Sequence, residues 1–208
     1  MENMEKISWR IWSSEGFGKA LLIGGLLFYI PVINLLMLGY YGVWVQKLVQ
    51  KKGMDLPEWR DGRAILNELL RIIGPYLLWV VVPFALAGLL VWAVSGMLSF
   101  LGLGFFTKTV AWLPVAVVAI LSPLAFTVSL VRLYRANNLK AALAVPEVLQ
   151  GMLQHLKASL FPILQYYGIL VLGWPLFGFA AFLGTLPLLA QLILIINRHD
   201  EDLKNEAY

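Results

Sequence analysis

Four long stretches of the chain contain no Asp, Glu, Lys or Arg, and they constrain the fold more than any other feature. They cover residues 20–46, 72–107, 109–131 and 158–197, and are 27, 36, 23 and 40 residues long. A helix needs about 20 apolar residues to cross the hydrocarbon core of a bilayer, where backbone polar groups must find partners within the protein. The stretches therefore predict an all-α integral membrane protein, a polytopic bundle of about six transmembrane helices.

The composition supports this fold class. Hydrophobic residues make up 60% of the chain and charged residues 13%, whereas soluble domains carry roughly 45–50% and about 25%. We therefore expect residues 1–208 to form a single membrane domain. The chain contains no Cys, which excludes disulfides, thiolate metal ligands and cysteine nucleophiles.

The basic residues predict an orientation. A six-helix topology with both termini inside places 15 of the 16 Lys and Arg residues on one side, and only Lys108 on the other. Basic residues favour the cytoplasmic ends of membrane helices. We therefore expect a multi-pass protein of the cytoplasmic (inner) membrane of a prokaryote, with both termini in the cytoplasm. Trp92 and Trp112 flank the outer segment around Lys108, where interfacial aromatic residues are common.

The first stretch, residues 20–46, allows two interpretations. Pro31 divides it into two halves that are each short for a full crossing. Pro31 and Asn34 favour a turn, which predicts a short or re-entrant hairpin. The alternative is one long, tilted helix with a kink at Pro31, which gives five crossings and an outside N-terminus.

Three segments outside these stretches have an amphipathic pattern. Residues 1–19 predict an interfacial segment, and residues 54–71 and 144–157 predict two cytoplasmic surface helices. Asp55 and Glu58, with Pro57 between them, resemble a helix start in the first connection. The polar side of this helix contains Arg63, Asn67 and Arg71, with Glu68 beside them; that of the second contains Gln150, Gln154 and Lys157. Residues 198–208 predict a cytoplasmic tail.

The two connections share a short pattern. Val145-Pro146-Glu147 repeats Leu56-Pro57-Glu58, and Gly151 repeats Gly62, all with an offset of 89 residues. The pattern indicates either a parallel internal repeat or chance similarity between apolar helices.

The first third of the chain resembles a known family. The segments that carry the resemblance are Gly24-Gly25-Leu26-Leu27, Ile30 to Leu36, Leu38-Gly39-Tyr40 and Leu56-Pro57-Glu58-Trp59, with Leu139-Lys140-Ala141-Ala142 further on. They look like a prokaryotic membrane-protein family catalogued as domain of unknown function 4013, clearly over residues 17–75 and more loosely beyond. Arg60-Asp61 stands where the family usually has an acidic pair. The resemblance implies a polytopic membrane protein and assigns no catalytic residues.

Two groups of residues are candidate contact sites. The first is a set of basic side chains expected to contact lipid headgroups: Lys47, Lys51, Lys52, Arg60, Arg63 and Arg71. The second is a set of polar side chains within the apolar stretches, Asn34, Gln165 and Gln191, for which helix-to-helix hydrogen bonds or substrate contacts are the alternatives. We expect His155 to face solvent or headgroups.

These observations predict a non-enzymatic protein: a scaffold, an accessory subunit or a lipid- or partner-binding protein. No acid, base or nucleophile constellation lies within the apolar stretches, and no residue spacing predicts a metal or a cofactor. Membrane lipids and a protein partner subunit are the expected partners, and nucleic acid is not. The alternative is a small transporter or lipid-handling protein that uses proline-broken helices around a neutral or lipidic substrate.

Overall fold

The computed structural model describes residues 4–30, 32–105 and 112–206, and this part of the chain is helical with no strand. The first half contains α1 (Met4–Trp12), α2 (Phe17–Leu27), α3 (Leu35–Val49), α4 (Gly62–Tyr76), the π-helical segment η1 (Leu77–Val81) and α5 (Val82–Phe100). The second half contains α7 (Leu113–Ala136), α8 (Leu139–Leu143), α9 (Val145–Leu172), the 3₁₀ turn η2 (Trp174–Leu176) and α10 (Phe177–Glu206). The all-α prediction is confirmed.

Three helices of the described chain are long and apolar enough to cross a membrane. They are Gly62–Phe100, Leu113–Ala136 and Trp174–Arg198. The helices α2 and α3 have 11 and 15 residues, so each extends about 16 to 23 Å and is shorter than a hydrocarbon core of about 30 Å. The predicted outer segment at Lys108 lies outside the described residues.

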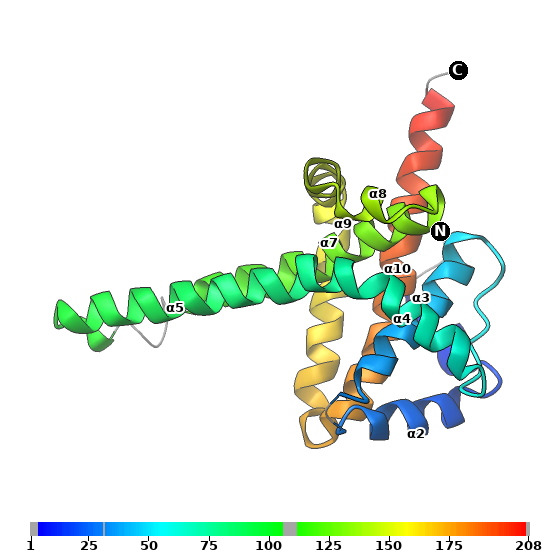
Figure 1. Cartoon of the computed structure of the whole chain (residues 1–208), viewed down its shortest axis with the longest axis horizontal. Coiled ribbons are helices and arrows are strands. Elements are labelled where there is room, and N and C mark those ends of the chain that lie inside the picture. Colours follow the sequence, from blue (N-terminus) through cyan, green and yellow to red (C-terminus); the bar gives the residue numbers. More distant parts are fainter. Residues whose placement is uncertain (1–3, 31, 106–111, 207–208) are drawn as a thin grey trace.

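The chain breaks between α2 and α3. Helix α2 ends at Leu27 and α3 begins at Leu35, with turn structure in the described residues between them. Figure 1 shows that the two helices then run in different directions. The break favours the two-helix interpretation of residues 20–46 over a single kinked helix. Pro31 itself lies outside the described residues.

The predicted surface helix at 54–71 and the span that follows it form one continuous helix. Gly62–Phe100 runs through α4, η1 and α5 without a loop. Residues 54–61 are not helical, so the helix begins at Gly62, later than the Asp55–Glu58 pattern predicts. In the second connection, Pro146 lies in the first turn of α9, so the repeated Leu/Val-Pro-Glu pattern adopts different structures in the two places.

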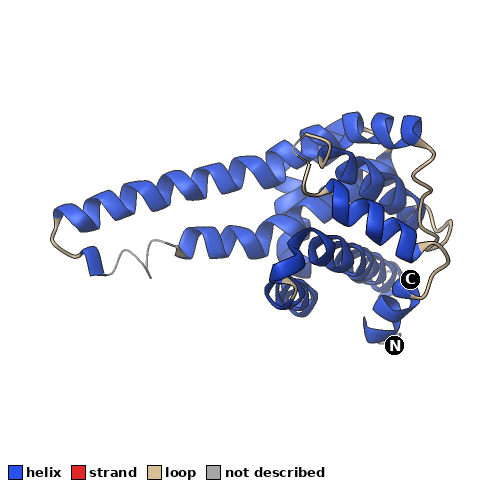
Figure 2. Cartoon of the chain, turned by 90° about the horizontal axis from the view of Figure 1, so that it is seen from below, coloured by secondary structure: helices blue, strands red, loops and turns tan. Residues whose placement is uncertain are grey.

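Two hairpins dominate the shape of the molecule. Helices α9 and α10 lie side by side, while α5 and the first half of α7 project away from the other helices in a different direction (Figures 1 and 2). The core lies where α3, α7 and α10 meet, and its largest fully buried side chains are Trp44, Tyr40 and Phe182. Helix α1 packs Ile7 and Ile11 against this core.

Three prolines within helices leave backbone carbonyls that side chains of other helices bind. Proline lacks an amide hydrogen for the carbonyl four residues before it. For Pro83 that carbonyl is Trp79 O, which accepts a hydrogen bond from Ser122 Oγ at 2.6 Å. The other two cases are Pro123, whose partner carbonyl Ala119 O accepts from Tyr167 Oη at 2.7 Å, and Pro187, whose partner carbonyl Leu183 O accepts from Trp12 Nε1 at 3.3 Å.

Candidate functional site

Helices α3 and α4 approach each other closely because α3 presents glycine to α4. A Cβ atom on Gly39 would lie 2.1 Å from the Ile65 carbonyl oxygen, and one on Gly42 would lie 2.8 Å from Glu68 Cγ. Such distances are too short for any side chain, so only glycine permits this contact. The two helices are therefore closely packed, and the connection between them, residues 50–61, lies against α3.

The connection is attached to α3 by two aromatic side chains. Trp44 Nε1 donates a hydrogen bond to the Met54 carbonyl at 3.1 Å. The Trp59 ring stacks on the Tyr40 ring, with centroids 4.3 Å apart and an angle of 15° between the planes. These contacts hold residues 54–61 in an extended path over α3. They explain why the Asp55–Glu58 segment does not become helical, since tertiary contacts override a local helix-start signal.

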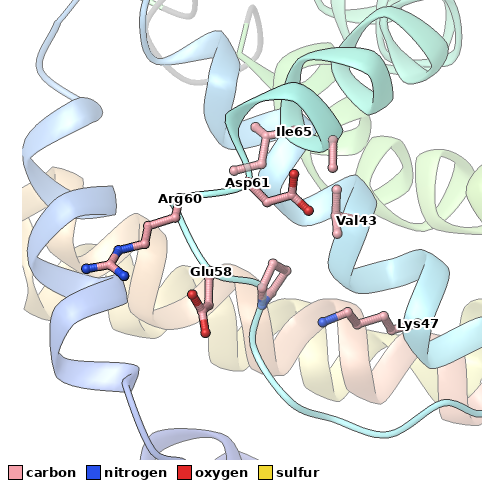
Figure 3. A pocket seen from close by; sticks show the side chains of 8 residues that line it. Val43, Lys47, Glu58, Arg60, Asp61 and Ile65 are labelled. Carbon is pink, nitrogen blue, oxygen red and sulfur yellow. The ribbon is translucent and has the colours of Figure 1, made fainter.

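A pocket of about 460 Å³ opens where this connection enters α4 (Figure 3). Its apolar surface comes from both helices and from the connection. Figure 3 shows that the Lys47 side chain reaches from α3 toward the connection, that Arg60 extends from the connection to the opposite side, and that Asp61 lies at the start of α4. The lining residues are Val43, Lys47, Pro57, Glu58, Arg60, Asp61, Ala64 and Ile65.

The four charged side chains of this pocket are not paired with the protein. Within the described part of the chain, none of them forms a side-chain hydrogen bond or an ion pair of 4.0 Å or less. Asp61 precedes the first residue of α4 but does not cap the helix with its side chain. Water or a ligand must therefore satisfy both the charges and the free amides at the start of α4.

The six predicted headgroup-contacting residues do not form one cluster. Lys47 and Arg60 line the pocket. Lys51 and Lys52 are exposed in the turn after α3, and Arg63 is exposed on the first turn of α4. The sixth residue, Arg71, belongs to a different and partly buried group.

Arg71 joins α4 to the cytoplasmic end predicted for α7. Its Nη2 donates to Asn137 Oδ1 at 2.6 Å, and its guanidinium carbon lies 5.3 Å from the centre of the Tyr134 ring. Its Nη1 lies 3.9 Å from Glu68 Oε2. The contacts occupy the guanidinium with protein groups, so Arg71 is a structural residue more than a headgroup contact.

Glu68 is buried, although its charge predicts an exposed position beside the polar side of the helix. Its exposed fraction is 8%, and its Oε1 lies 2.8 Å from Tyr134 Oη, which is also 3.0 Å from the Gly42 carbonyl. The signal was present in the sequence. Glu68 falls on the same helical face as Ile65, Leu69 and Ile72, all of which are buried.

The three predicted intramembrane polar residues do not converge on one place. Gln191 is buried and donates from Nε2 to Ser8 Oγ of α1 at 3.1 Å. Asn34 lies in the turn before α3, and Gln165 lies half-buried on α9. This arrangement gives Gln191 a helix-to-helix contact and does not form a substrate site from the three.

His155 does not face solvent or headgroups, and that prediction is wrong. Its exposed fraction is 4%, on the buried face of α9 that also contains Val148 and Met152. Gln150, Gln154 and Lys157 of this segment are exposed, and so are Leu149 and Leu153. Among the residues that the structure describes, no three His, Asp or Glu side chains are grouped so that they could hold a metal ion.

Comparison with known proteins identifies the family. The family model described as "Protein of unknown function (DUF4013)" matches residues 22–189, which include the pocket and all helices from α3 to α9. No curated protein and no solved structure matches the chain. The matched segment covers most of the chain, and the chain therefore belongs to this family, Protein of unknown function (DUF4013).

Proposed function

We propose that this chain is a non-enzymatic multi-pass membrane protein that binds lipid headgroups in the pocket between α3 and α4. The observation that carries the proposal is the set of four charged side chains around a pocket of about 460 Å³ without partners in the described protein. A volume in this range accommodates a small ligand. The distribution of Lys and Arg in the sequence supports a cytoplasmic location for the pocket in a prokaryotic inner membrane.

The surface next to the pocket also supports contact with lipid. On α4, Leu66 and Leu70 are 48% and 66% exposed, and Arg63 is exposed on the same helix. A helix that presents leucines beside a basic residue is suited to the boundary between headgroups and acyl chains. The pocket and this surface would then meet the same lipid layer.

Transport receives less support from the structure. Broken helices in transporters leave carbonyls free to coordinate a substrate. Here the Trp79, Ala119 and Leu183 carbonyls accept hydrogen bonds from side chains of the protein. They serve packing between helices in this conformation.

The proposal is tested with the purified full chain in detergent. Phospholipids bound per protein are measured by native mass spectrometry for the wild type and for a Lys47→Glu/Arg60→Glu variant. We expect at least tenfold weaker lipid binding, because each basic residue near a headgroup contributes about 1 kcal/mol and each is reversed in sign. The control is Lys140→Glu/Lys157→Glu, which reverses two exposed charges outside the pocket.

The control variant is expected to bind lipid as the wild type does. Equal lipid binding by the pocket variant and the wild type would overturn the proposal. If a protein subunit co-purifies with the wild type in stoichiometric amount but not with the pocket variant, the partner of the pocket is a protein and not a lipid.

A further inference from the structure

The hairpin formed by α5 and residues 113–121 of α7 has the length of a bilayer core. Burial inside the protein ends at the same level on both of its helices, where Ser122 Oγ donates to the Trp79 carbonyl. Beyond this level, Ala87 is the one buried residue of α5, and residues 113–121 include none. Helix α5 has 19 residues and is therefore about 29 Å long, close to a hydrocarbon core of about 30 Å.

This hairpin also presents an uncharged, apolar surface. The parts of the sequence that contain it, residues 72–107 and 109–131, have no Asp, Glu, Lys or Arg. Leu86, Leu90 and Trp92 are among the exposed side chains of α5. An exposed surface without charges over the thickness of a bilayer fits lipid acyl chains.

Helix α10 has different surroundings, because α1 packs along its middle. Trp12 Nε1 donates to the Leu183 carbonyl at 3.3 Å, and Gln191 Nε2 donates to Ser8 Oγ at 3.1 Å. Both contacts lie near the centre of the Trp174–Arg198 helix. Any bilayer that α10 crossed would therefore contain α1 as well.

The connection between α3 and α4 lies at a similar level of α10. Its Trp59 ring stacks on the Tyr40 ring with centroids 4.3 Å apart, and the Tyr40 ring centroid lies 5.9 Å from that of Phe182 on α10. Glu58 and Arg60, the neighbours of Trp59 in the chain, are both exposed.

A bilayer around α10 would thus surround charged side chains with hydrocarbon. Lys6 and Arg10 are exposed on α1, in addition to Glu58 and Arg60 on the connection. Ionisable side chains that face lipid in the hydrocarbon region are strongly unfavourable. The most apolar part of α10 is instead covered by protein, since 72% of it is buried inside the molecule.

From these observations we infer that the α5–α7 hairpin alone crosses the bilayer and that α9 and α10 stay with the other helices on the cytoplasmic side. Figure 1 shows that α5 runs across the direction of α9 and α10, so the two hairpins cannot both follow the normal of one flat bilayer. The distribution of basic residues fits this topology as well as it fits six crossings, because both place 15 of the 16 Lys and Arg residues on one side. The inference goes beyond the proposed function, whose pocket stays on the cytoplasmic side in either topology.

Helix α9 then lies at the membrane surface, next to the base of the hairpin. Tyr167 Oη donates to the Ala119 carbonyl of α7 at 2.7 Å. Phe161 and Leu164 are exposed on the same helix, and Lys157 is exposed one turn before Phe161. Apolar side chains beside a basic residue suit the boundary between acyl chains and headgroups.

Cysteine labelling in sealed membrane vesicles tests the inference, because the chain has no Cys of its own. Three single-cysteine variants of the full chain replace exposed residues: Gln154→Cys near the start of α9, Leu172→Cys at its end and Leu101→Cys at the end of α5. Inverted and right-side-out inner-membrane vesicles of a bacterial host are treated with a membrane-impermeant maleimide. We expect Gln154→Cys and Leu172→Cys to react at least about tenfold faster in inverted vesicles, and Leu101→Cys at least about tenfold faster in right-side-out vesicles, because the bilayer excludes the reagent.

The decisive site is Leu172→Cys, since six crossings place it on the same side as Leu101→Cys. That result would overturn the inference, and so would protection of Leu172→Cys in both kinds of vesicle, which would place the turn between α9 and α10 inside the bilayer. Reaction of Leu101→Cys on the same side as Gln154→Cys would show that the hairpin does not cross, and would also overturn it. In detergent all three variants should react fully, which is the control for accessibility in the folded chain. The proposed function is decided separately, by lipid binding to the Lys47→Glu/Arg60→Glu variant.

Discussion

The two hairpins of this protein, α5 with α7 and α9 with α10, both contain long apolar helices, but the other helices cover them to different extents. Gly62–Phe100 and Trp174–Arg198 are both apolar enough to cross a membrane, yet 11% of the most apolar part of the first is buried inside the protein, against 72% of the second. Figure 2 shows the first hairpin extending alone from the remaining helices. Apolar composition therefore marks both segments as able to cross a membrane but does not say whether lipid or protein covers them.

The largest expected difference comes from the same truncation in the two hairpins. Leu189 on α10 is 5% exposed and Leu89 on α5 is 62% exposed. We expect Leu189→Ala to lower the free energy of unfolding by about 2–5 kcal/mol because it creates a cavity. Leu89→Ala should change it by about 0.5 kcal/mol or less. Unfolding in mixed detergent micelles measures both, and equal losses would mean that a second protein molecule covers α5.

Glycine substitutions should have opposite effects in the two hairpins. A Cβ on Gly178 of α10 would lie 2.7 Å from the Gly25 carbonyl oxygen, whereas Gly88 of α5 has no atom within 4 Å. Gly178→Ala should destabilise the protein by about 1–3 kcal/mol through overpacking. Gly88→Ala should stabilise it by about 0.5–1 kcal/mol, because alanine favours a helix more than glycine does. Melting temperatures of the two variants that shift in the same direction would contradict this prediction.

A hydrogen bond between Tyr167 and Ala119 joins the two hairpins, and a double-mutant cycle measures it. Tyr167 of α9 donates to the Ala119 carbonyl of α7, whose helical donor is missing because residue 123 is proline. We expect Tyr167→Phe to cost about 1 kcal/mol. In a Pro123→Ala background the cost should fall to nearly zero, because the amide of residue 123 then satisfies the carbonyl. A cost that is the same in both backgrounds would show that the bond is independent of the proline.

The smallest expected effect on the unfolding free energy is that of removing the Tyr40 hydroxyl. Tyr40 packs against Phe182 of α10, but its hydroxyl has no hydrogen-bond partner in the described part of the chain. Tyr40→Phe should leave the unfolding free energy within about 0.5 kcal/mol of the wild type. Tyr134→Phe is the matched comparison, and it should cost about 1–3 kcal/mol because the Glu68 contact is lost. A large loss for Tyr40→Phe would reveal a bound polar partner for that hydroxyl.

The positions of the helices were largely predictable, because hydrocarbon requires long apolar helices and charged residues mark their ends. The stretch 158–197 is 40 residues long, which is enough for two helices of about 20 residues, and the chain turns between Leu172 and Phe177. The start of α4 was not predictable from its own residues. Trp44 and Trp59, which hold the preceding segment on α3, do so through contacts that no local pattern encodes.

The candidate site was predictable only in part. The charge pattern pointed to Lys47 and Arg60, and the structure places both at one pocket. The same charge pattern includes Arg71, whose contacts with Asn137 and Tyr134 depend on where α7 ends. The pattern does not predict Glu58 and Asp61 at the site, because they line the same pocket as Lys47 only when the connection folds over α3.

The proline-linked hydrogen bonds have a consequence for how these helices can move. The residue rise of an α-helix is about 1.5 Å, so a slide of α7 along α9 by a single residue would break a contact of 2.7 Å between Tyr167 and Ala119. An unsatisfied carbonyl costs several kcal/mol wherever water cannot replace the lost donor, as in hydrocarbon. The same holds where Ser122 meets Trp79 and where Trp12 meets Leu183. The three hydrogen bonds therefore oppose sliding of one helix along another. Motions that tilt or rotate a hairpin about these contacts keep the bonds and cost less free energy.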